Sequence, residues 1–313
     1  MKIAILGAGA IGSIFAYQLS RAGHDVTVIA RNSRLAALRK TGGISVRHLL
    51  SGKVDWASVQ VSDALSPSTA WDLLLVPVQR QQVDSLVDVV AASSARRIMF
   101  MFNTAGDIAS LRDRVGRDRF LWGFPAALGA LEGGAVRYEV VPSWLRFLQI
   151  TTIGGLADYV PPDLQSIREL FVGADIPTAL CTDMSAWLKT HAAFMVPLMA
   201  AGVLVNEEGT LPWEAARSAA NAMLEGFRLV RSSGVKLQPA QMAAASQLPR
   251  SAVAVSIWFA FQIGFVREIL QAHVSHAHGE VYALLRDLRG LAGDRDSPAL
   301  AALQRVVESK LKH

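Results

Sequence analysis

The sequence predicts an α/β fold in which a doubly wound sheet is followed by an all-helical domain. Three observations support this class. The chain opens on a strand-like run, a glycine-rich turn, an amphipathic stretch and a second strand-like run, which is the order of a β-α-β unit. Short apolar runs then alternate with helical segments as far as residue 180. After residue 185 only long helical periodicities remain. We therefore expect two domains, residues 1–180 and residues 181–313.

A glycine-rich turn follows the first predicted strand, Lys2–Leu6, and fits the pattern G-x-G-x-x-G. In such a turn the first glycine allows a tight bend, the second lets a phosphate approach the backbone, and the third lets the helix pack closely on the strand. The helix predicted at Ile11–Ala22 presents free N–H groups and the positive end of its dipole to an anion. A β-α-β turn without a ligand is the alternative. We expect a Rossmann-like domain that binds a dinucleotide pyrophosphate at Gly7, Ala8, Gly9, Ala10, Ile11 and Gly12.

The end of the second predicted strand, Asp25–Ala30, distinguishes between two cofactors. NAD-binding units carry Asp or Glu about 20 residues beyond the glycines to hold the ribose 2′-hydroxyl, whereas NADP sites carry Arg there. This chain has no carboxylate in that window and reads Arg31, Asn32, Ser33, Arg34. Arg31, helped by Asn32 and Arg34, can grip a 2′-phosphate through charge-assisted hydrogen bonds. NADP is the predicted cofactor; the alternative is that two arginines open a solvated helix.

The composition fits an enzyme of two domains. The 313 residues suffice for a large core, and 51% of them are apolar. The net charge of +5 comes from dispersed basic residues, without the clustered stripe of a nucleic-acid-binding protein. The single cysteine, Cys181, permits no internal disulfide and indicates a reducing, cytoplasmic location. The apolar run Ser251–Val266 is too short to span a membrane. We expect it to form a core helix or the interface of a homodimer.

The rest of the first domain is predicted as short strands and helices between Gly and Pro breaks. Two runs, Asp72–Val78 and Arg97–Phe102, are apolar enough for central parallel strands. Residues just past the carboxyl ends of such strands line the ligand crevice, which makes Gln79 and Asn103 candidates; an ordinary turn is the alternative for Asn103. The other predicted strands are Gly43–His48, Ala57–Val61, Phe120–Ala126, Ala135–Val141, Leu145–Ile153 and Ile176–Leu180, and the helices are Val83–Ala92 and Pro161–Gly173. We expect the first two of these strands to form an excursion that pairs near the edge of the main sheet.

The second domain is predicted as a series of helices. Apolar residues recur at three-to-four spacing from Trp213 to Val230, and Gly234 ends that helix. Ser297 and Pro298 supply an N-cap and a first-turn proline for the last helix. The predicted helices are Trp187–Val205, Trp213–Ser233, Ser251–Ala272, His276–Leu291 and Pro298–Leu311.

Lys189 is the candidate proton donor of this domain. It lies near the start of the first long helix, and no other charged residue follows until Glu207. Partial burial of its amine would suit Lys189 to act as a general acid. A lysine that lays its stem on apolar surface and keeps its amine in water is an equally good interpretation.

Five features together resemble the ketopantoate reductase (2-dehydropantoate 2-reductase) family: the glycine turn with Arg31, the DLLLV strand before Gln82, the strand ending at Asn103, the W-x-K of Trp187–Lys189, and Glu280 before a helical pattern. The resemblance implies NADPH-dependent reduction of a 2-oxo acid, ketopantoate or a related compound, in a cleft between the domains. It implies that Lys189 is the general acid, that Glu280 holds the substrate hydroxyl and supports the lysine, and that Asn103 lies between nicotinamide and substrate.

Three positions depart from the family pattern. Gln79 beside Arg80 stands where the family has a lysine after the strand. The family also has asparagines one and two turns beyond the catalytic lysine, where Ala192–Pro197 contains no amide. His191 or Thr190 are the candidates to supply the missing substrate contacts. We expect a divergent member whose substrate need not be ketopantoate; the alternative is an NADP(H)-binding sensor or scaffold without reductase activity.

His273, His276, His278 and Glu280 form the one cluster with spacing typical of metal ligands, since residues three and four positions apart share a helix face. Metal sites usually gather ligands from separated segments, so we favour a polar helix face and expect no metal. Cys181 is predicted to be a small buried residue rather than a nucleophile.

Overall fold

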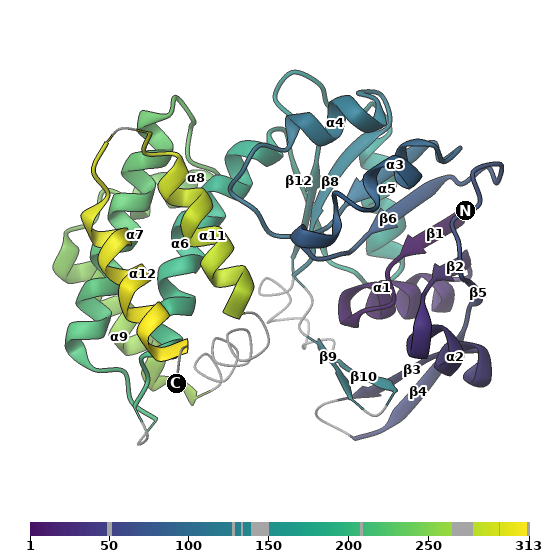
Figure 1. The fold of residues 1–313 in the computed structure, drawn as a ribbon, viewed down its shortest axis with the longest axis horizontal. Helices are drawn as coiled ribbons and strands as arrows, with labels where there is room; N and C mark the ends of the chain where they lie inside the picture. The colour runs from purple at the N-terminus through teal and green to yellow at the C-terminus, as the bar shows by residue number, and fades with distance from the viewer. Residues whose placement is uncertain are drawn as a thin grey trace. The chain divides into compact units, whose positions relative to one another are not determined.

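The computed structural model describes residues 1–48, 52–126, 129–132, 134–138, 150–206, 209–264, 278–293 and 295–311. Its backbone contacts divide the chain into two compact units. One comprises Met1–Phe102 and Ile108–Met184, and the other comprises Asn103–Asp107 and Ser185–His313. The first unit holds all the strands found in the described residues and the second holds helices (Figure 1), which confirms the predicted α/β class.

The first unit is built on an eight-stranded sheet in the order β12-β11-β8-β7-β6-β1-β2-β5. Strand β1 (Lys2–Leu6) pairs in parallel with β2 (Asp25–Ile29) on one side and with β6 (Leu73–Val76) on the other. The carboxyl ends of β1 and β6 therefore meet at the switch point where doubly wound sheets bind ligands. The remaining strands are β5 (Gln60–Ser62), β7 (Arg97–Phe100), β8 (Phe120–Phe124), β11 (Thr151–Gly154), which is antiparallel to β8, and β12 (Thr178–Cys181).

A second sheet packs on α1 (Ala10–Arg21) in the order β4-β3-β10-β9. It corrects the expectation that Gly43–His48 and Ala57–Val61 are an excursion at the main sheet's edge. Only β5 joins that edge, beside β2. The inward residues Ile44 and Val46 are fully buried in the core around α1, so burial decides which sheet this segment joins. The strands are β3 (Gly43–His48), β4 (Val54–Ser58), β9 (Gly129–Glu132) and β10 (Ala135–Tyr138).

Short helices connect the strands of the first unit. The helix predicted at Val83–Ala92 is shorter, because a 3₁₀ turn precedes it and only five residues form α3. Helix α4 was not predicted from the sequence, since Leu111 and Val115 are its only buried residues and leave little apolar pattern. Residues 145–149 of the predicted strand Leu145–Ile153 lie outside the described ranges. The connecting helices are α2 (Asn32–Thr41), η1 (Arg80–Gln82), α3 (Val87–Ala91), α4 (Ala109–Val115) and α5 (Leu164–Gly173).

The helical unit packs around one apolar core. Its helices are α6 (Met184–Val203), α7 (Trp213–Ser232), α8 (Ala240–Ala245), α9 (Arg250–Gln262), α11 (His278–Gly290) and α12 (Pro298–Leu311). Helix α12, yellow in Figure 1, lies beside α7 and α11. Helices α6 and α7 approach closely where a Cβ added to Gly226 would lie 3.1 Å from the Ala193 Cβ.

Two expectations for the helical unit need correction or extension. The cap of α12 comes from another helix, since the Glu225 carboxylate on α7 accepts the N–H groups of Ala299 at 2.6 Å and Leu300 at 3.0 Å. The helix predicted at Ser251–Ala272 is described only as α9, and residues 265–272 lie outside the described ranges. In the part of the chain that is described, no helix has the length and apolar character needed to cross a membrane.

Candidate functional site

The three glycines after β1 meet three different environments. Gly7 has a φ of +124°, which side chains disfavour, and its N–H donates to the Ile29 carbonyl at 3.1 Å. A Cβ at Gly12 would lie 1.9 Å from the Gly7 carbonyl oxygen, so α1 packs on the turn only because position 12 has no side chain. A Cβ at Gly9 would meet no atom of the described residues within 4 Å. The backbone at Gly9 is therefore open to a ligand.

The N-terminus of α1 is free to bind an anion. Gly9 is its N-cap residue, no side chain of the described residues caps the helix, and its first turn contains no acidic residue. Uncapped N–H groups and the positive end of the helix dipole attract phosphate. The open backbone at Gly9 and this helix end together fit a pyrophosphate, with Ala8, Ala10 and Ile11 contributing backbone.

Arg31 lies just beyond β2, beside the glycine turn's strand, and is the N-cap residue of α2. Its side chain is exposed and makes no ion pair or hydrogen bond with the residues that the structure describes. Asn32 follows with a positive φ of 51°, and α2 has neither a side-chain cap nor an acidic residue in its first turn. This arrangement offers a guanidinium and a second open helix end to a phosphate.

Arg34 differs from the expectation that it helps Arg31. Its guanidinium turns back to the glycine turn, where Nε donates to the Ala8 carbonyl at 3.1 Å and Nη2 donates to Ser13 Oγ at 3.0 Å. Nη1 donates to the Gly134 carbonyl at 2.9 Å. Burial lowers the pKa of Arg34, because desolvation disfavours the charged form. No signal in the sequence distinguishes this arginine from Arg31.

Gln79 follows β6 and lies at the same edge of the sheet as the glycine turn. The two segments touch, since a Cβ on Gly7 would lie 3.4 Å from the Pro77 carbonyl oxygen. The Gln79 side chain is engaged locally, where its Oε1 accepts from Gln81 Nε2 at 2.7 Å. The Gln79 N–H donates to Gln82 Oε1 at 3.1 Å. Gln79 and the neighbouring Arg80 are both exposed.

Asn103 follows β7 and is half-buried. Its Oδ1 is fully buried and finds no hydrogen-bond partner among the residues described. Buried polar atoms are seldom left unpaired in native proteins. Next to it, Thr104 is 2% exposed; it donates to Asp287 Oδ2 of α11 at 3.1 Å and accepts from the Gly106 N–H at 3.0 Å. These contacts tie residues 103–107 to the helical unit, which the sequence did not indicate.

Lys189 lies in the second turn of α6 and is half-buried. Its amine has no hydrogen-bond or ion-pair partner within the described ranges. His191, two residues on, stacks on the Trp187 ring with centroids 4.7 Å apart and an interplanar angle of 10°. Thr190 is fully buried, donating to the Ala186 carbonyl at 2.8 Å and accepting from the Gln238 N–H at 3.2 Å.

The turns beyond Lys189 belong to the helical core. Ala192, Ala193 and Val196 are all 0% exposed, and Ala193 packs against Gly226 of α7. No polar side chain replaces the family's two amides at these positions. Thr190 is also engaged within the core, so of the two candidate substitutes His191 remains the one at the margin of the core.

Glu280 lies in the first turn of α11, the helix that also carries Asp287. Its side chain lies outside the described residues, as do His273, His276 and the side chain of His278. The proposed contacts of Glu280 and the metal-like cluster are therefore not part of the described geometry.

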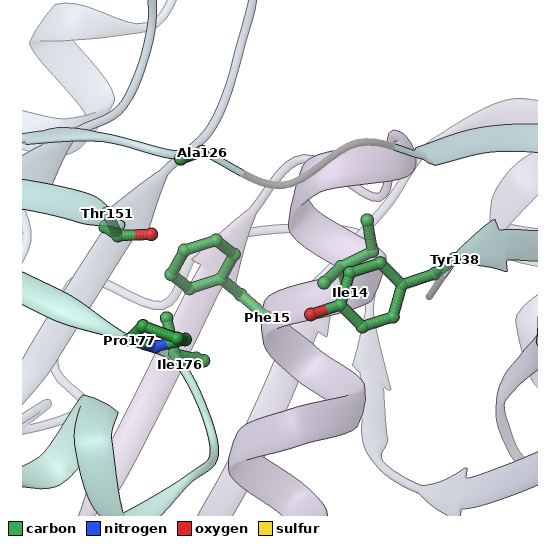
Figure 2. Close-up of a pocket in the computed structure, with 7 residues that line it drawn as sticks. All are labelled: Ile14, Phe15, Ala126, Tyr138, Thr151, Ile176 and Pro177. Atoms are coloured by element: carbon green, nitrogen blue, oxygen red, sulfur yellow. The ribbon is translucent and has the colours of Figure 1, made fainter. Parts of the chain in front are cut away.

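A small cavity is lined by residues of α1, β10 and β11 and by Ile176 and Pro177. Figure 2 shows Ile14 of α1 beside Tyr138 of β10, and Phe15 pointing toward Thr151, Ile176 and Pro177. Its volume is about 10 Å³, which is room for one water molecule. A dinucleotide cannot enter it, so the cavity is a packing defect of the core.

Residues 3–142 match the family model described as "Ketopantoate reductase PanE/ApbA". The 2-dehydropantoate 2-reductase of Bacillus subtilis is 34% identical over 138 residues, which are 44% of this chain and 42% of that enzyme. The enzyme of the same name from Pyrococcus abyssi is 26% identical over 75% of this chain and 76% of its own length. The alignment with the Bacillus enzyme therefore spans less than half of either protein.

The fold also resembles that of D-mandelate dehydrogenase, solved with NADH and anilino(oxo)acetate. The likeness covers 100% of this chain and 98% of that one, with a TM-score of 0.76 and 16% sequence identity. At this identity the comparison shows a shared fold over both units.

Proposed function

We propose that this chain, a divergent member of the ketopantoate reductase family, is an oxidoreductase that reduces a 2-oxo acid to the 2-hydroxy acid with NADPH. The observation that carries the proposal is the glycine turn at the switch point, where the backbone at Gly9 is open and the N-terminus of α1 is uncapped. Open N–H groups at this point of a doubly wound sheet favour a dinucleotide.

The preference for NADPH rests on Arg31. The window after β2 contains no carboxylate to hold a ribose 2′-hydroxyl, and the exposed Arg31 guanidinium has donors to offer a 2′-phosphate. Asn103 and Gln79, at the carboxyl ends of neighbouring strands, complete the proposed cofactor contacts. When bound, the nicotinamide supplies the hydride that adds to the substrate's carbonyl carbon.

Hydride addition leaves negative charge on the carbonyl oxygen, which needs a proton. We assign this proton to the Lys189 ammonium, because Lys189 is half-buried and its amine has no competing partner among the described residues. Glu280 is proposed to hold the substrate hydroxyl and support the lysine. The unpaired Oδ1 of Asn103 is proposed to accept a hydrogen bond from the bound nicotinamide or the substrate. This bond would offset the free-energy cost of leaving a buried acceptor without a partner.

The substrate is proposed to be ketopantoate or a related 2-oxo acid. The turns beyond Lys189 offer no amide because Ala192, Ala193 and Val196 fill the helical core. Polar contacts to the substrate must come from elsewhere, and His191, held by its stacking on Trp187, is the proposed replacement. This difference supports a substrate range distinct from that of the family's typical members.

The proposal is tested by NADPH oxidation against a panel of 2-oxo acids that includes ketopantoate and aryl-substituted 2-oxo acids. We expect turnover with at least one of them and tight binding of NADPH without substrate. Tight binding with no turnover on any member of the panel would instead support an NADP(H)-binding sensor or scaffold, the function that the missing amides leave open. Failure to bind either NADPH or NADH would contradict both functions.

A homodimer is the proposed assembly. Helix α9 carries an exposed apolar stripe, defined by Val255, Trp258 and Phe259, of which Phe259 is 62% exposed. Residues three or four apart share one face of a helix, and exposed apolar surface of this kind favours a partner.

A further inference from the structure

Arg34 connects three parts of the chain: its own helix α2, the glycine turn with the start of α1, and the connection between β9 and β10. Through its three nitrogens it donates to the Ala8 carbonyl within the glycine turn, to Ser13 Oγ in α1, and to the Gly134 carbonyl between β9 and β10. Ser13 is fully buried and its hydroxyl also donates to the Ala8 carbonyl at 3.3 Å. The Ala8 carbonyl thus accepts two hydrogen bonds, and its direction is tightly determined.

The direction of that carbonyl decides where the next N–H points. In a planar trans peptide the C=O and the following N–H point to opposite sides. The Ala8 carbonyl is drawn toward Arg34, so the Gly9 N–H is turned the other way. That N–H donates to no residue in the described ranges, and a Cβ on Gly9 would meet nothing within 4 Å. The hydrogen bonds from Arg34 and Ser13 to the Ala8 carbonyl therefore orient the Gly9 N–H toward open space.

We infer that Arg34 is a positioning residue of the dinucleotide site, which orients the Ala8–Gly9 peptide toward the pyrophosphate instead of contacting the 2′-phosphate. This inference rests on the proposed cofactor function. It gives two arginines three residues apart separate tasks. Arg31 selects NADPH over NADH. Arg34 strengthens the binding of both cofactors, because the pyrophosphate is common to the two.

The test compares the dissociation constants of NADPH and NADH for the full chain by fluorescence or calorimetric titration, without substrate. In Arg34→Lys the charge remains but the forked geometry is lost. We expect both cofactors to bind about tenfold more weakly, with the NADPH-to-NADH preference unchanged. In the matched variant Arg31→Gln we expect NADPH to weaken by about tenfold or more while NADH binding stays the same.

Ser13→Ala provides a second, milder test, since it removes the hydroxyl that accepts from Arg34 and donates to Ala8. It should raise the dissociation constants of NADPH and NADH by the same factor. It replaces Arg34→Lys as the test if that variant does not fold. A loss confined to NADPH in Arg34→Lys would make Arg34 a phosphate ligand and overturn the inference. Unchanged binding of both cofactors in folded Arg34→Lys or Ser13→Ala would also overturn it. An unaltered chain that binds neither cofactor would instead refute the proposed function.

Discussion

At the scale of single residues, one short pattern contains glycines with different physical reasons to be there. At Gly12 any side chain would collide with the Gly7 carbonyl, because its Cβ would lie 1.9 Å from that oxygen. At Gly9 the same test finds open space. Packing within the protein therefore requires glycine at position 12, whereas no such packing constraint acts at position 9. The open space beside the Gly9 N–H, which has no partner among the described residues, leaves room for a ligand phosphate.

Lys189 is the residue on which the proposed chemistry depends. In Lys189→Ala we expect the turnover number to fall by roughly 10²–10⁴, the usual contribution of a general acid. The dissociation constant for NADPH should not change, since the role proposed for Lys189 is proton donation to the substrate and not cofactor binding. Steady-state kinetics and a cofactor titration measure the two quantities.

The matched control is Lys236→Ala, which removes an exposed lysine of the same unit. It should leave the turnover number near that of the unaltered chain. A Lys189→Ala protein that binds NADPH and turns over a confirmed substrate at the unaltered rate would rule out the role given to Lys189.

At the scale of elements, a helix end can depend on a distant helix. The Glu225 carboxylate, 4% exposed, binds the first N–H groups of α12. Both N–H groups donate to Oε2, so the oxygen that remains in Glu225→Gln can still accept them, but the negative charge at the N-terminus of α12 is lost. We expect the free energy of unfolding to fall by about 1 kcal/mol, measured by urea denaturation.

Glu214→Gln is the control for that measurement, because Glu214 lies on the same helix, α7, and forms an exposed pair with Arg217. Exposed pairs contribute little, so its unfolding free energy should stay close to that of the unaltered chain. Equal losses in the two variants would show that the cap does not stabilise α12.

A carboxylate also links α1 to the second sheet. Asp55 of β4 accepts from Tyr17 Oη at 3.4 Å and lies 3.8 Å from Arg21 Nη1, both on α1. Burial raises the pKa of Asp55, but the hydrogen bond from His48 and the charges of Lys53 and Arg21 outweigh it, and the net pKa is lowered. A lowered pKa in the folded state means that ionised Asp55 stabilises the fold above its ordinary pKa, and that this is lost as the pH falls.

Asp55→Asn should therefore melt at a lower temperature than the unaltered chain at neutral pH. The difference should shrink as the pH falls below about 4, where the unaltered carboxyl takes up its proton. Melting curves at several pH values measure the difference in melting temperature. Asp84→Asn, at an exposed residue, is the control. A difference that stays constant down to the acid range would contradict the contribution of the charge.

At the scale of the whole molecule, the proposed homodimer depends on the apolar stripe of α9. Light scattering after gel filtration should give twice the chain mass for the unaltered protein, and the chain mass for Phe259→Glu. Val172→Glu alters an exposed apolar residue of α5 in the other unit and should remain dimeric. A monomeric unaltered protein would refute the proposed assembly.

The sequence predicted the elements whose signals are local. The strand, glycine turn, helix and strand from Lys2 to Ile29 agree with it, as do α7 and α12 within one or two residues. These segments are determined by apolar periodicity and by glycine and proline at their ends. Helices α4 and α8 were missed because they are short and bury few residues. The second sheet was missed because strand partners cannot be read from an apolar run.

By itself, therefore, the sequence determined the α/β class, the order of the main elements, and the candidate dinucleotide turn with Arg31 beside it. Only the tertiary structure decided that Arg34 turns back to the Ala8 carbonyl, and that Thr104 binds Asp287, 183 positions away along the chain. Backbone geometry and periodicity act between near neighbours in sequence. The partner of a long side chain depends on which segments the folded core brings together, and two arginines three residues apart can therefore have different roles.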